Sequence, residues 1–263
     1  MSTRVIAITG ASAGIGRATA LRLARDGHAV AACARRGDRL EALAGEVVAR
    51  GGRALPIVAD VTRDSDMQRF IAATIDTFGR LDVLMCNAGF GIYGAIDDIS
   101  PEQMQRLVDV NFMGTYYATR AALPVMRRQQ HGHVVIISSI VGKRGVPYMG
   151  AYSATKFAQV GMAECLRAEV AGSDIHVTVV CPVTTDSEFV DVMLRETGSD
   201  ISSSLGPRQT AEHVADSIAA AIERPRAEVY PFMKSRGLVL LNAVAPAFCD
   251  RVVKKFGRQP VRR

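Results

Sequence analysis

The chain has 263 residues, of which 48% are hydrophobic and 22% charged, and its formal net charge is +6. This length is sufficient for one large domain with a substantial core. Residues 224–263 carry 10 basic and 2 acidic side chains, whereas residues 1–223 carry 22 basic and 24 acidic ones. A nucleic-acid-binding protein would carry a basic stripe on its folded body, so we expect no nucleic-acid partner.

The cysteines and the N-terminal sequence bear on the cellular location. The five cysteines are odd in number and form no CxxC pair, which indicates reduced thiols and no bound metal. The first apolar run, VIAITG, is too short for a secretory signal, and no segment reaches the roughly 20 apolar residues of a membrane span. We therefore expect a cytoplasmic protein.

Short apolar runs alternate with longer amphipathic stretches along the chain. The runs that we expect to be strands lie at 5–9, 29–33, 54–59, 81–86, 133–138, 176–181 and 227–232. Continuously apolar strands that alternate with helices indicate a parallel sheet covered on both faces. The sequence therefore predicts an α/β fold with a doubly wound parallel sheet over residues 1–230. A basic, apolar helical extension follows at 231–263.

Two helix starts carry local signals. Asp38 followed by Glu41 predicts a capping box that opens the second helix. Ser100 followed by Pro101 predicts another helix start, with the proline at the first helical position.

A glycine-rich turn, GASAGIG, joins the first predicted strand to the first helix. Glycines let a backbone turn tightly and approach a pyrophosphate, which rests on the amides of a helix N-terminus. The spacing, preceded by Thr9, resembles the TGxxxGxG motif of the short-chain dehydrogenase/reductase family. The resemblance implies a Rossmann-type fold of about seven strands. It also implies that a nicotinamide dinucleotide is bound by Thr9, Gly10, Ser12, Ala13, Gly14, Ile15 and Gly16.

The end of the second predicted strand bears on the choice of dinucleotide. A carboxylate here would bind the ribose 2′-hydroxyl of NAD, but this chain has Arg35 and Arg36. Arginine pairs bidentately with a 2′-phosphate, which favours NADP(H) over NAD(H). The alternative is that both arginines only solvate a loop.

Further positions match the family's cofactor site. Asp60 and Val61 match the pair that contacts adenine, and CNAG at 86–89 matches the family's NNAG with one replacement. Asn87 either fixes the central sheet or contacts the cofactor. The family's Pro-Gly is Pro182-Val183 here, so a branched side chain stands beside the nicotinamide position. The resemblance implies further cofactor contacts by Asp60, Val61, Asn87, Ala88, Gly89, Pro182, Val183 and Thr185.

A second constellation resembles the family's catalytic tetrad. Tyr152 and Lys156 lie four residues apart and so share one face of a predicted helix. Ser139, at the carboxyl end of the fifth predicted strand, matches the family's spacing to this tyrosine better than Ser138 does. With Asn111 from DVNFMGTYY, the resemblance implies catalysis by Asn111, Ser139, Tyr152 and Lys156, of which Tyr152 and Lys156 also contact the cofactor.

The chemistry fits these residue types. Hydride transfer to a carbonyl leaves an alkoxide that needs a proton, and Tyr152 is the predicted acid/base. We expect the Lys156 ammonium and the charged nicotinamide to lower the pKa of the phenol from about 10. Ser139 would hydrogen-bond the substrate oxygen. Asn111 would hold a water that links Lys156 to solvent.

Apolar loop residues indicate a hydrophobic substrate. We expect a mobile lid at about 184–209 and no metal site. The predicted substrate pocket consists of Phe90, Ile92, Tyr93, Val141, Tyr148, Met149, Val183, Phe189 and Met193.

The C-terminal extension replaces the glycine-rich end that is typical of tetrameric family members. It resembles the tail of the microsomal hydroxysteroid dehydrogenases and their bacterial relatives. Residues 238–256 could lie in a membrane interface, but docking on the protein's own core or on a partner subunit is the favoured interpretation. We expect a homodimer or homotetramer.

The sequence thus predicts an NADP(H)-dependent oxidoreductase that interconverts a hydrophobic ketone or aldehyde and its alcohol. Two alternatives stay open. One is a 3-oxoacyl thioester reductase, for which Lys143 and Arg144 are the evident basic residues to receive an acyl carrier. The other is a dinucleotide-sensing regulator without turnover, which would not need Tyr152.

Overall fold

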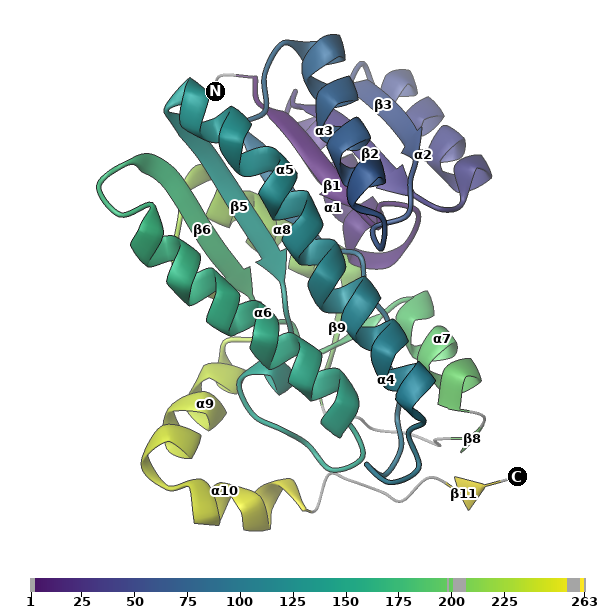
Figure 1. Cartoon of the computed structure of the whole chain (residues 1–263), viewed down its shortest axis with the longest axis vertical. Helices are drawn as coiled ribbons and strands as arrows, with labels where there is room; N and C mark the ends of the chain where they lie inside the picture. The colour runs from purple at the N-terminus through teal and green to yellow at the C-terminus, as the bar shows by residue number, and fades with distance from the viewer. Residues whose placement is uncertain (1–2, 198, 201–206, 255–260, 263) are drawn as a thin grey trace.

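The computed structural model describes residues 3–197, 199–200, 207–254 and 261–262, and its centre is a seven-stranded sheet (Figure 1). The strand order is β10-β6-β5-β4-β1-β2-β3, and every neighbouring pair is parallel. Each run that the sequence marked as a strand forms one, so the predicted doubly wound fold is confirmed. The strands are β1 (Val5–Thr9), β2 (Ala29–Ala34), β3 (Arg53–Val58), β4 (Val83–Cys86), β5 (His131–Ile137), β6 (Asp174–Val180) and β10 (Glu228–Val229).

Helices cover both faces of the sheet. The helices of one face are α1 (Gly14–Arg25), α2 (Gly37–Ala49) and α8 (Ala211–Glu223), and those of the other are α3 (Asp64–Phe78), α5 (Gly114–Gln129) and α6 (Gly150–Glu169). Successive strand residues point to opposite faces of the sheet. Ile6 and Ile8 therefore pack on the face covered by α1, α2 and α8, and Ala7 packs on the face covered by α3, α5 and α6. Both sides are apolar, which explains why the strand sequences do not alternate with polar residues.

The two predicted helix starts have different outcomes. Ser100 caps α4 (Pro101–Leu107) and forms a capping box with Gln103, as expected for a helix that starts here. The box predicted at Asp38 is wrong, because α2 begins at Gly37 after Arg36 and has no side-chain cap. Asp38 lies instead in the first turn, where its charge faces the positive end of the helix dipole.

Between α4 and α5 the chain forms a π-helical turn, η1 (Val108–Met113). Such turns change the direction in which the following side chains point, and they are frequent at functional sites. Asn111 lies in this turn and is completely buried. The turn therefore directs Asn111 toward the interior, below the carboxyl end of the sheet.

The segment expected to form a lid contains a helix. The short strand β7 (Thr184–Asp186) pairs with β9 (Arg208–Thr210), and α7 (Glu188–Thr197) lies between them in the chain. The strands β8 (Ser199–Asp200) and β11 (Val261–Arg262) pair antiparallel. Residues 198 and 201–206 of the expected lid lie outside the described residues. Figure 1 shows α7 beyond the carboxyl ends of the strands.

The C-terminal extension forms two helices, α9 (Lys234–Val244) and α10 (Pro246–Val253). Cys249 and Val253 are buried, and Arg144 bonds to Asn242 and forms an ion pair with Asp250. The extension therefore contacts the body of the protein through both apolar and polar side chains. Within residues 3–197 and 207–254, no helix has the length and the apolar character needed to cross a bilayer.

Candidate active site

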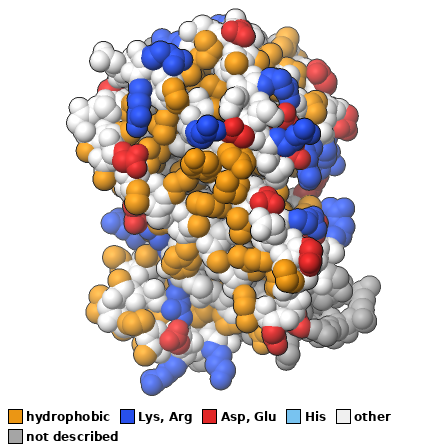
Figure 2. Space-filling view, in the orientation of Figure 1, with side chains coloured by type: hydrophobic (Ala, Val, Ile, Leu, Met, Phe, Trp, Pro, Cys, Tyr) orange, Lys and Arg blue, Asp and Glu red, His pale blue; other side chains and the backbone are white. Residues whose placement is uncertain are grey.

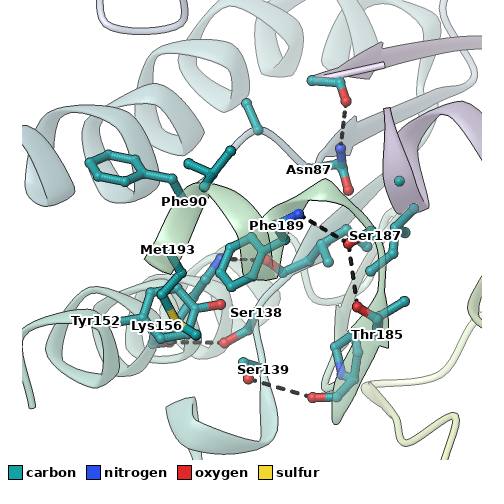
Figure 3. A pocket seen from close by; sticks show the side chains of 18 of the residues that line it. Asn87, Phe90, Ser138, Ser139, Tyr152, Lys156, Thr185, Ser187, Phe189 and Met193 are labelled. Carbon is teal, nitrogen blue, oxygen red and sulfur yellow. Dashed lines mark hydrogen bonds between the residues drawn. The ribbon is translucent and has the colours of Figure 1, made fainter. Parts of the chain in front are cut away.

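A cavity of about 890 Å³ runs along the carboxyl ends of the central strands (Figure 3). Its wall includes the glycine turn after β1, the loops after β2 to β6, and helix α7. From β1 the chain adds β2 and β3 on one side and then β4, β5 and β6 on the other, so the strand order reverses between β1 and β4. In open α/β sheets this is the place at which ligands bind.

The glycine turn leaves space at one end of this cavity. Gly10 has φ +67°, and a Cβ on it would lie 2.7 Å from the Ala88 Cα. A Cβ on Gly16 would lie 2.5 Å from the Asn87 side-chain nitrogen. The cap residue Ala13 offers no side-chain acceptor to the first amides of α1. The cavity wall here consists of Gly10, Ser12, Ala13, Gly14 and Ile15, so it suits a diphosphate held by backbone amides.

Thr9 and Asn87 hold the glycine turn in place. The Thr9 hydroxyl accepts hydrogen bonds from the amides of Asn87 (3.0 Å) and Ala88 (3.1 Å). The Asn87 side chain donates in return to the Thr9 and Gly10 carbonyls, both at 3.0 Å. Thr9 and Gly16 do not contribute to the cavity wall, whereas Asn87 does. Asn87 was expected either to fix the central sheet or to contact the cofactor. Its hydrogen bonds to the Thr9 and Gly10 carbonyls show the first of these.

Arg36 lies at the far end of the cavity and is already engaged. Its Nε and Nη2 donate to the Ser12 hydroxyl at 3.2 and 2.9 Å, and its Nη1 lies 2.8 Å from a Glu188 carboxylate oxygen. Glu188 also forms an ion pair with Arg39, and the two arginines lower the pKa of this carboxyl. Arg35 also lines the cavity. The two arginines predicted from sequence thus reach the same cavity as the glycine turn.

The remaining predicted cofactor residues also lie in the wall. They are Asp60, Val61, Ala88, Gly89, Pro182, Val183 and Thr185. The Val183 carbonyl accepts a hydrogen bond from the Thr185 hydroxyl at 3.0 Å, which fixes the loop after β6. The departure from the family's glycine is therefore accommodated within an ordered turn.

Tyr152, Ser139 and Lys156 meet at the other end of the cavity. Lys156 Nζ lies 5.6 Å from the centre of the Tyr152 ring, and the Phe189 ring lies 5.6 Å from it on another side. Ser138 also lines the cavity, but its hydroxyl donates to the Lys156 carbonyl at 3.0 Å. Ser139 is the serine that hydrogen-bonds with Tyr152, and its catalytic role stays a prediction.

Burial controls the protonation of this pair. Desolvation raises the pKa of Tyr152, and a hydrogen bond with Ser139 offsets only part of this rise. Desolvation also lowers the pKa of Lys156 to about 7. The sequence had predicted that Lys156 lowers the pKa of Tyr152. In the structure the Lys156 ammonium donates instead to the Ile137 carbonyl (2.9 Å) and to Gln159 (3.1 Å), and the loss of solvent dominates for the phenol.

Asn111 lies behind the cavity and not in its wall. Its side-chain amide donates to the Phe90 carbonyl (2.9 Å) and to Thr155 Oγ1 (3.0 Å), and its carbonyl oxygen accepts from the Phe90 amide (3.0 Å). The side chain therefore ties the loop after β4 to α6. Its backbone carbonyl accepts a bond from Gln159 Nε2 at 2.7 Å.

The predicted substrate pocket is correct in part. Six of its residues line the cavity: Phe90, Val141, Met149, Val183, Phe189 and Met193. Ile92, Tyr93 and Tyr148 do not; Ile92 and Tyr93 are buried in the apolar cluster beneath it, and Tyr148 packs against that cluster. The cavity wall also includes C-terminal residues that no sequence pattern predicted: Phe232, Lys234, Ser235, Leu238 and Val253.

Helix α7 is attached at both ends, which holds Phe189 and Met193 against the cavity. Glu188 pairs with Arg36 at its start, and Glu196 receives two bonds of 3.0 Å from Arg106 near its end. From the sequence a mobile lid was expected here, and neither this helix nor its polar attachments were predicted. Across the part of the chain that is described, no His, Cys, Asp and Glu side chains form a group of three that could hold a metal ion.

Comparisons with known proteins agree with this geometry. The family model for short chain dehydrogenase matches residues 4–197. An uncharacterized oxidoreductase, YxnA, of Bacillus subtilis is 33% identical over 97% of this chain and 73% of its own length. A 3-ketodihydrosphingosine reductase of Bacteroides thetaiotaomicron is 37% identical over 73% of this chain and 67% of its own.

A solved structure gives the same result in three dimensions. An alcohol dehydrogenase from Thermococcus sibiricus, complexed with 5-hydroxy-NADP, has a TM-score of 0.78 and 28% identity. The match covers 87% of this chain and 96% of that one. With the glycine turn and the Tyr152–Lys156 pair in one cavity, these matches identify the chain as a member of the short chain dehydrogenase family, an oxidoreductase that uses a nicotinamide dinucleotide.

Proposed function

We propose that the protein is an NADP(H)-dependent reductase of hydrophobic ketones or aldehydes, with Tyr152 as the proton donor. The observation that carries the proposal is the composition of the cavity: Ser139, Tyr152 and Lys156 lie at an apolar end, and Arg36 lies at the other end. When bound, the nicotinamide supplies the hydride for the substrate carbon, or accepts it in reverse.

Each residue has a distinct part in this reaction. The Tyr152 hydroxyl gives its proton to the substrate oxygen as negative charge develops there. Ser139 donates a hydrogen bond to the same oxygen and orients the carbonyl. Lys156 would hold the nicotinamide ribose and provide positive charge beside the phenol. Because burial raises the pKa of Tyr152, the phenol holds its proton at neutral pH and is in the state that can donate to a developing alkoxide.

The substrate class follows from the wall around Tyr152. Val141, Met149, Phe189 and Met193 are apolar and surround the phenol end of the cavity. A hydrophobic carbonyl compound loses water-exposed surface in such a site, whereas a charged one would lose its hydration. The name of the Bacteroides relative likewise denotes reduction of a keto group.

The preference for NADP(H) rests on the arginine end. Arg36 is tied to Ser12 beside the glycine turn, so its guanidinium is close to the expected diphosphate site. A fixed guanidinium can bind a 2′-phosphate with two hydrogen bonds, which NAD(H) cannot offer. The relative from Thermococcus sibiricus was solved with an NADP derivative.

A 3-oxoacyl thioester reductase is the alternative enzyme, and the basic residues count against it. Lys143 pairs with Glu228 and lies 3.7 Å from Glu164, and Arg144 pairs with Asp250. Basic residues that are already neutralised offer an acidic carrier protein little net attraction.

We also propose that the protein forms a homodimer or homotetramer. Figure 2 shows hydrophobic side chains over the middle of the face on which α5 and α6 lie. On these helices Tyr116 and Phe157 are 42% and 45% exposed. Large apolar side chains gathered on a surface are typical of an interface.

The test is consumption of NADPH and of NADH with a panel of hydrophobic ketones, aldehydes and one 3-oxoacyl thioester. Tyr152→Phe should abolish turnover and leave NADPH binding intact, because it removes only the hydroxyl. Tyr117→Phe removes a phenol from α5, away from the cavity wall, and should leave turnover unchanged. NADPH binding without Tyr152-dependent turnover of any panel member would instead favour the dinucleotide-sensing regulator.

A further inference from the structure

Gln159 lies one turn after Lys156 on α6 and is completely buried. Its Oε1 accepts a hydrogen bond from Lys156 Nζ at 3.1 Å. Its Nε2 donates to the Asn111 carbonyl at 2.7 Å and to Thr115 Oγ1 at 2.8 Å. An ammonium can only donate and a backbone carbonyl can only accept, so these partners fix which end of the amide faces which group.

The Gln159 side chain therefore lies between Lys156 and Asn111. The Asn111 carbonyl also accepts a bond from Thr115 Oγ1 at 2.8 Å, so two side chains bind this carbonyl. The sequence had predicted a water at Asn111 that links Lys156 to solvent. In the structure, the buried Gln159 side chain links Lys156 to the Asn111 carbonyl, and it joins α6 directly to the η1 turn; the water itself stays a prediction.

The contacts of Lys156 show what the amide does for the ammonium. One N–H binds the Ile137 carbonyl and a second binds Gln159, so the third is available to the cavity that Lys156 lines. Both acceptors are oxygens that stabilise the charged form. The Ile137 acceptor is a backbone carbonyl, whereas the Gln159 acceptor belongs to a side chain and can be removed by substitution.

We propose that Gln159 is a positioning residue that holds the Lys156 ammonium toward the cavity and keeps it charged near neutral pH. The proposal rests on the proposed function only for the role of Lys156 in the reaction. The contact between the two side chains, and its effect on the lysine, do not depend on that function.

The other titratable groups near Lys156 carry no negative charge at neutral pH that would stabilise its ammonium in place of Gln159. The titratable groups that face it are Tyr152 on α6 and Cys181 after β6, and burial keeps both of them uncharged by raising their pKa values. Desolvation lowers the pKa of Lys156 to about 7, although Cys181 acts in the opposite direction. A hydrogen bond to a charged group is worth about one to two pKa units, so loss of the Gln159 bond matters at neutral pH.

The test measures the charge of Lys156 directly, without substrate or cofactor. The chain has only five lysines, Lys143, Lys156, Lys234, Lys254 and Lys255, so ¹³C-labelled lysine gives few NMR signals. A Lys156→Met variant assigns the signal. We then compare the titration midpoint of the Lys156 side chain in the wild type, Gln159→Met and Gln159→Glu.

The two variants are expected to shift the midpoint in opposite directions. Gln159→Met removes the acceptor and should lower the midpoint by about one unit or more. Gln159→Glu places a carboxylate beside the ammonium and should raise it. Gln129→Met is the matched control, because the Gln129 side chain also uses both ends of its amide, with Leu81 and His131 as partners, but belongs to α5 and does not contact Lys156.

A purely structural role for Gln159 would lower stability and leave the midpoint in place. Midpoints within about 0.3 units of the wild type in both Gln159 variants would overturn the proposal. So would a shift of the same size in Gln129→Met. Because no step needs turnover, failure of this test is distinct from failure of the proposed function, which is judged by the Tyr152→Phe assay.

Discussion

Replacement of Arg36 by alanine should weaken NADPH binding much more than NADH binding. Arg36 lines the cavity beside the glycine turn, and two of its nitrogens bind Ser12, which holds the guanidinium in position. A hydrogen bond from a charged donor to the 2′-phosphate contributes about 1.5–3 kcal/mol to the binding free energy. Arg36 must give up its ion pair with Glu188 to make this bond, which costs up to about 1 kcal/mol because both side chains are about two-fifths exposed. The net loss is therefore about 1–2 kcal/mol, or roughly 5- to 30-fold in Kd.

Replacement of Glu188 by glutamine should act in the opposite direction. The Glu188 carboxylate binds Arg36 and Arg39, so it competes with a 2′-phosphate for the same guanidinium groups. Removal of its charge should strengthen NADPH binding by about 2- to 5-fold, the range of an exposed ion pair. NADH carries no phosphate at this position, so its Kd should change little.

Isothermal titration calorimetry of both dinucleotides measures these effects on four proteins: wild type, Arg36→Ala, Glu188→Gln and Arg195→Ala. Arg195 is the control, because it is an exposed arginine of α7 outside the cavity wall. High salt should reduce the effects of the first two substitutions, since exposed charges are screened. The reasoning is refuted if Arg36→Ala weakens NADH and NADPH equally, or if Glu188→Gln weakens NADPH.

Two further predictions concern stability and pH. Gly16→Ala should cost about 1–3 kcal/mol and weaken dinucleotide binding, because its Cβ would lie 2.5 Å from Asn87 Nδ2; Gly45→Ala, which meets no atom within 4 Å, should be neutral or stabilising in urea unfolding. Burial lowers the pKa of His133 to about 3, so the unfolded chain binds a proton first as the pH falls below about 6.5. The free energy of unfolding should therefore fall by about 2 kcal/mol between pH 7 and pH 5 because of this ring. His133→Leu should remove that fall in urea unfolding at the two pH values. An unchanged pH dependence in the variant would contradict the argument.

The fold could be predicted because its signals are local. Each strand of the central sheet is a short apolar run, and the glycine turn follows the first of them directly. The steric need for glycine is also local in part, since Gly10 has a positive φ. Ser139, Tyr152 and Lys156 were predicted from the resemblance to the family's catalytic tetrad, and the rule that strand ends meet at one edge of the sheet is consistent with their placement.

The errors at the site come from tertiary packing. The direction of the Tyr152 pKa depends on how completely the phenol is desolvated, and no pattern in the sequence gives that quantity. Tyr148 was expected in the pocket, but it has φ +64° and its ring packs near Tyr93, 5.8 Å away. A loop residue's side-chain direction depends on such backbone details, so hydrophobicity alone cannot assign it to a cavity.

The residues that the sequence missed make polar contacts between distant segments. Glu188 reaches Arg36 across 152 positions, and Gln159 reaches the Asn111 carbonyl across 48. Each looks ordinary in its own helix: a glutamate in the first turn of α7 and a glutamine in the middle of α6. Only the folded chain reveals that one faces the arginine end of the cavity and the other faces the lysine.

Helix α7 connects these two ends of the cavity through neighbouring residues. Glu188 binds the arginines, and the next residue, Phe189, lies against the Tyr152 ring. A helix turn is stiff, because its backbone hydrogen bonds fix successive residues relative to one another. One turn of α7 therefore contacts both the arginine end of the cavity, through Glu188, and the Tyr152 end, through Phe189.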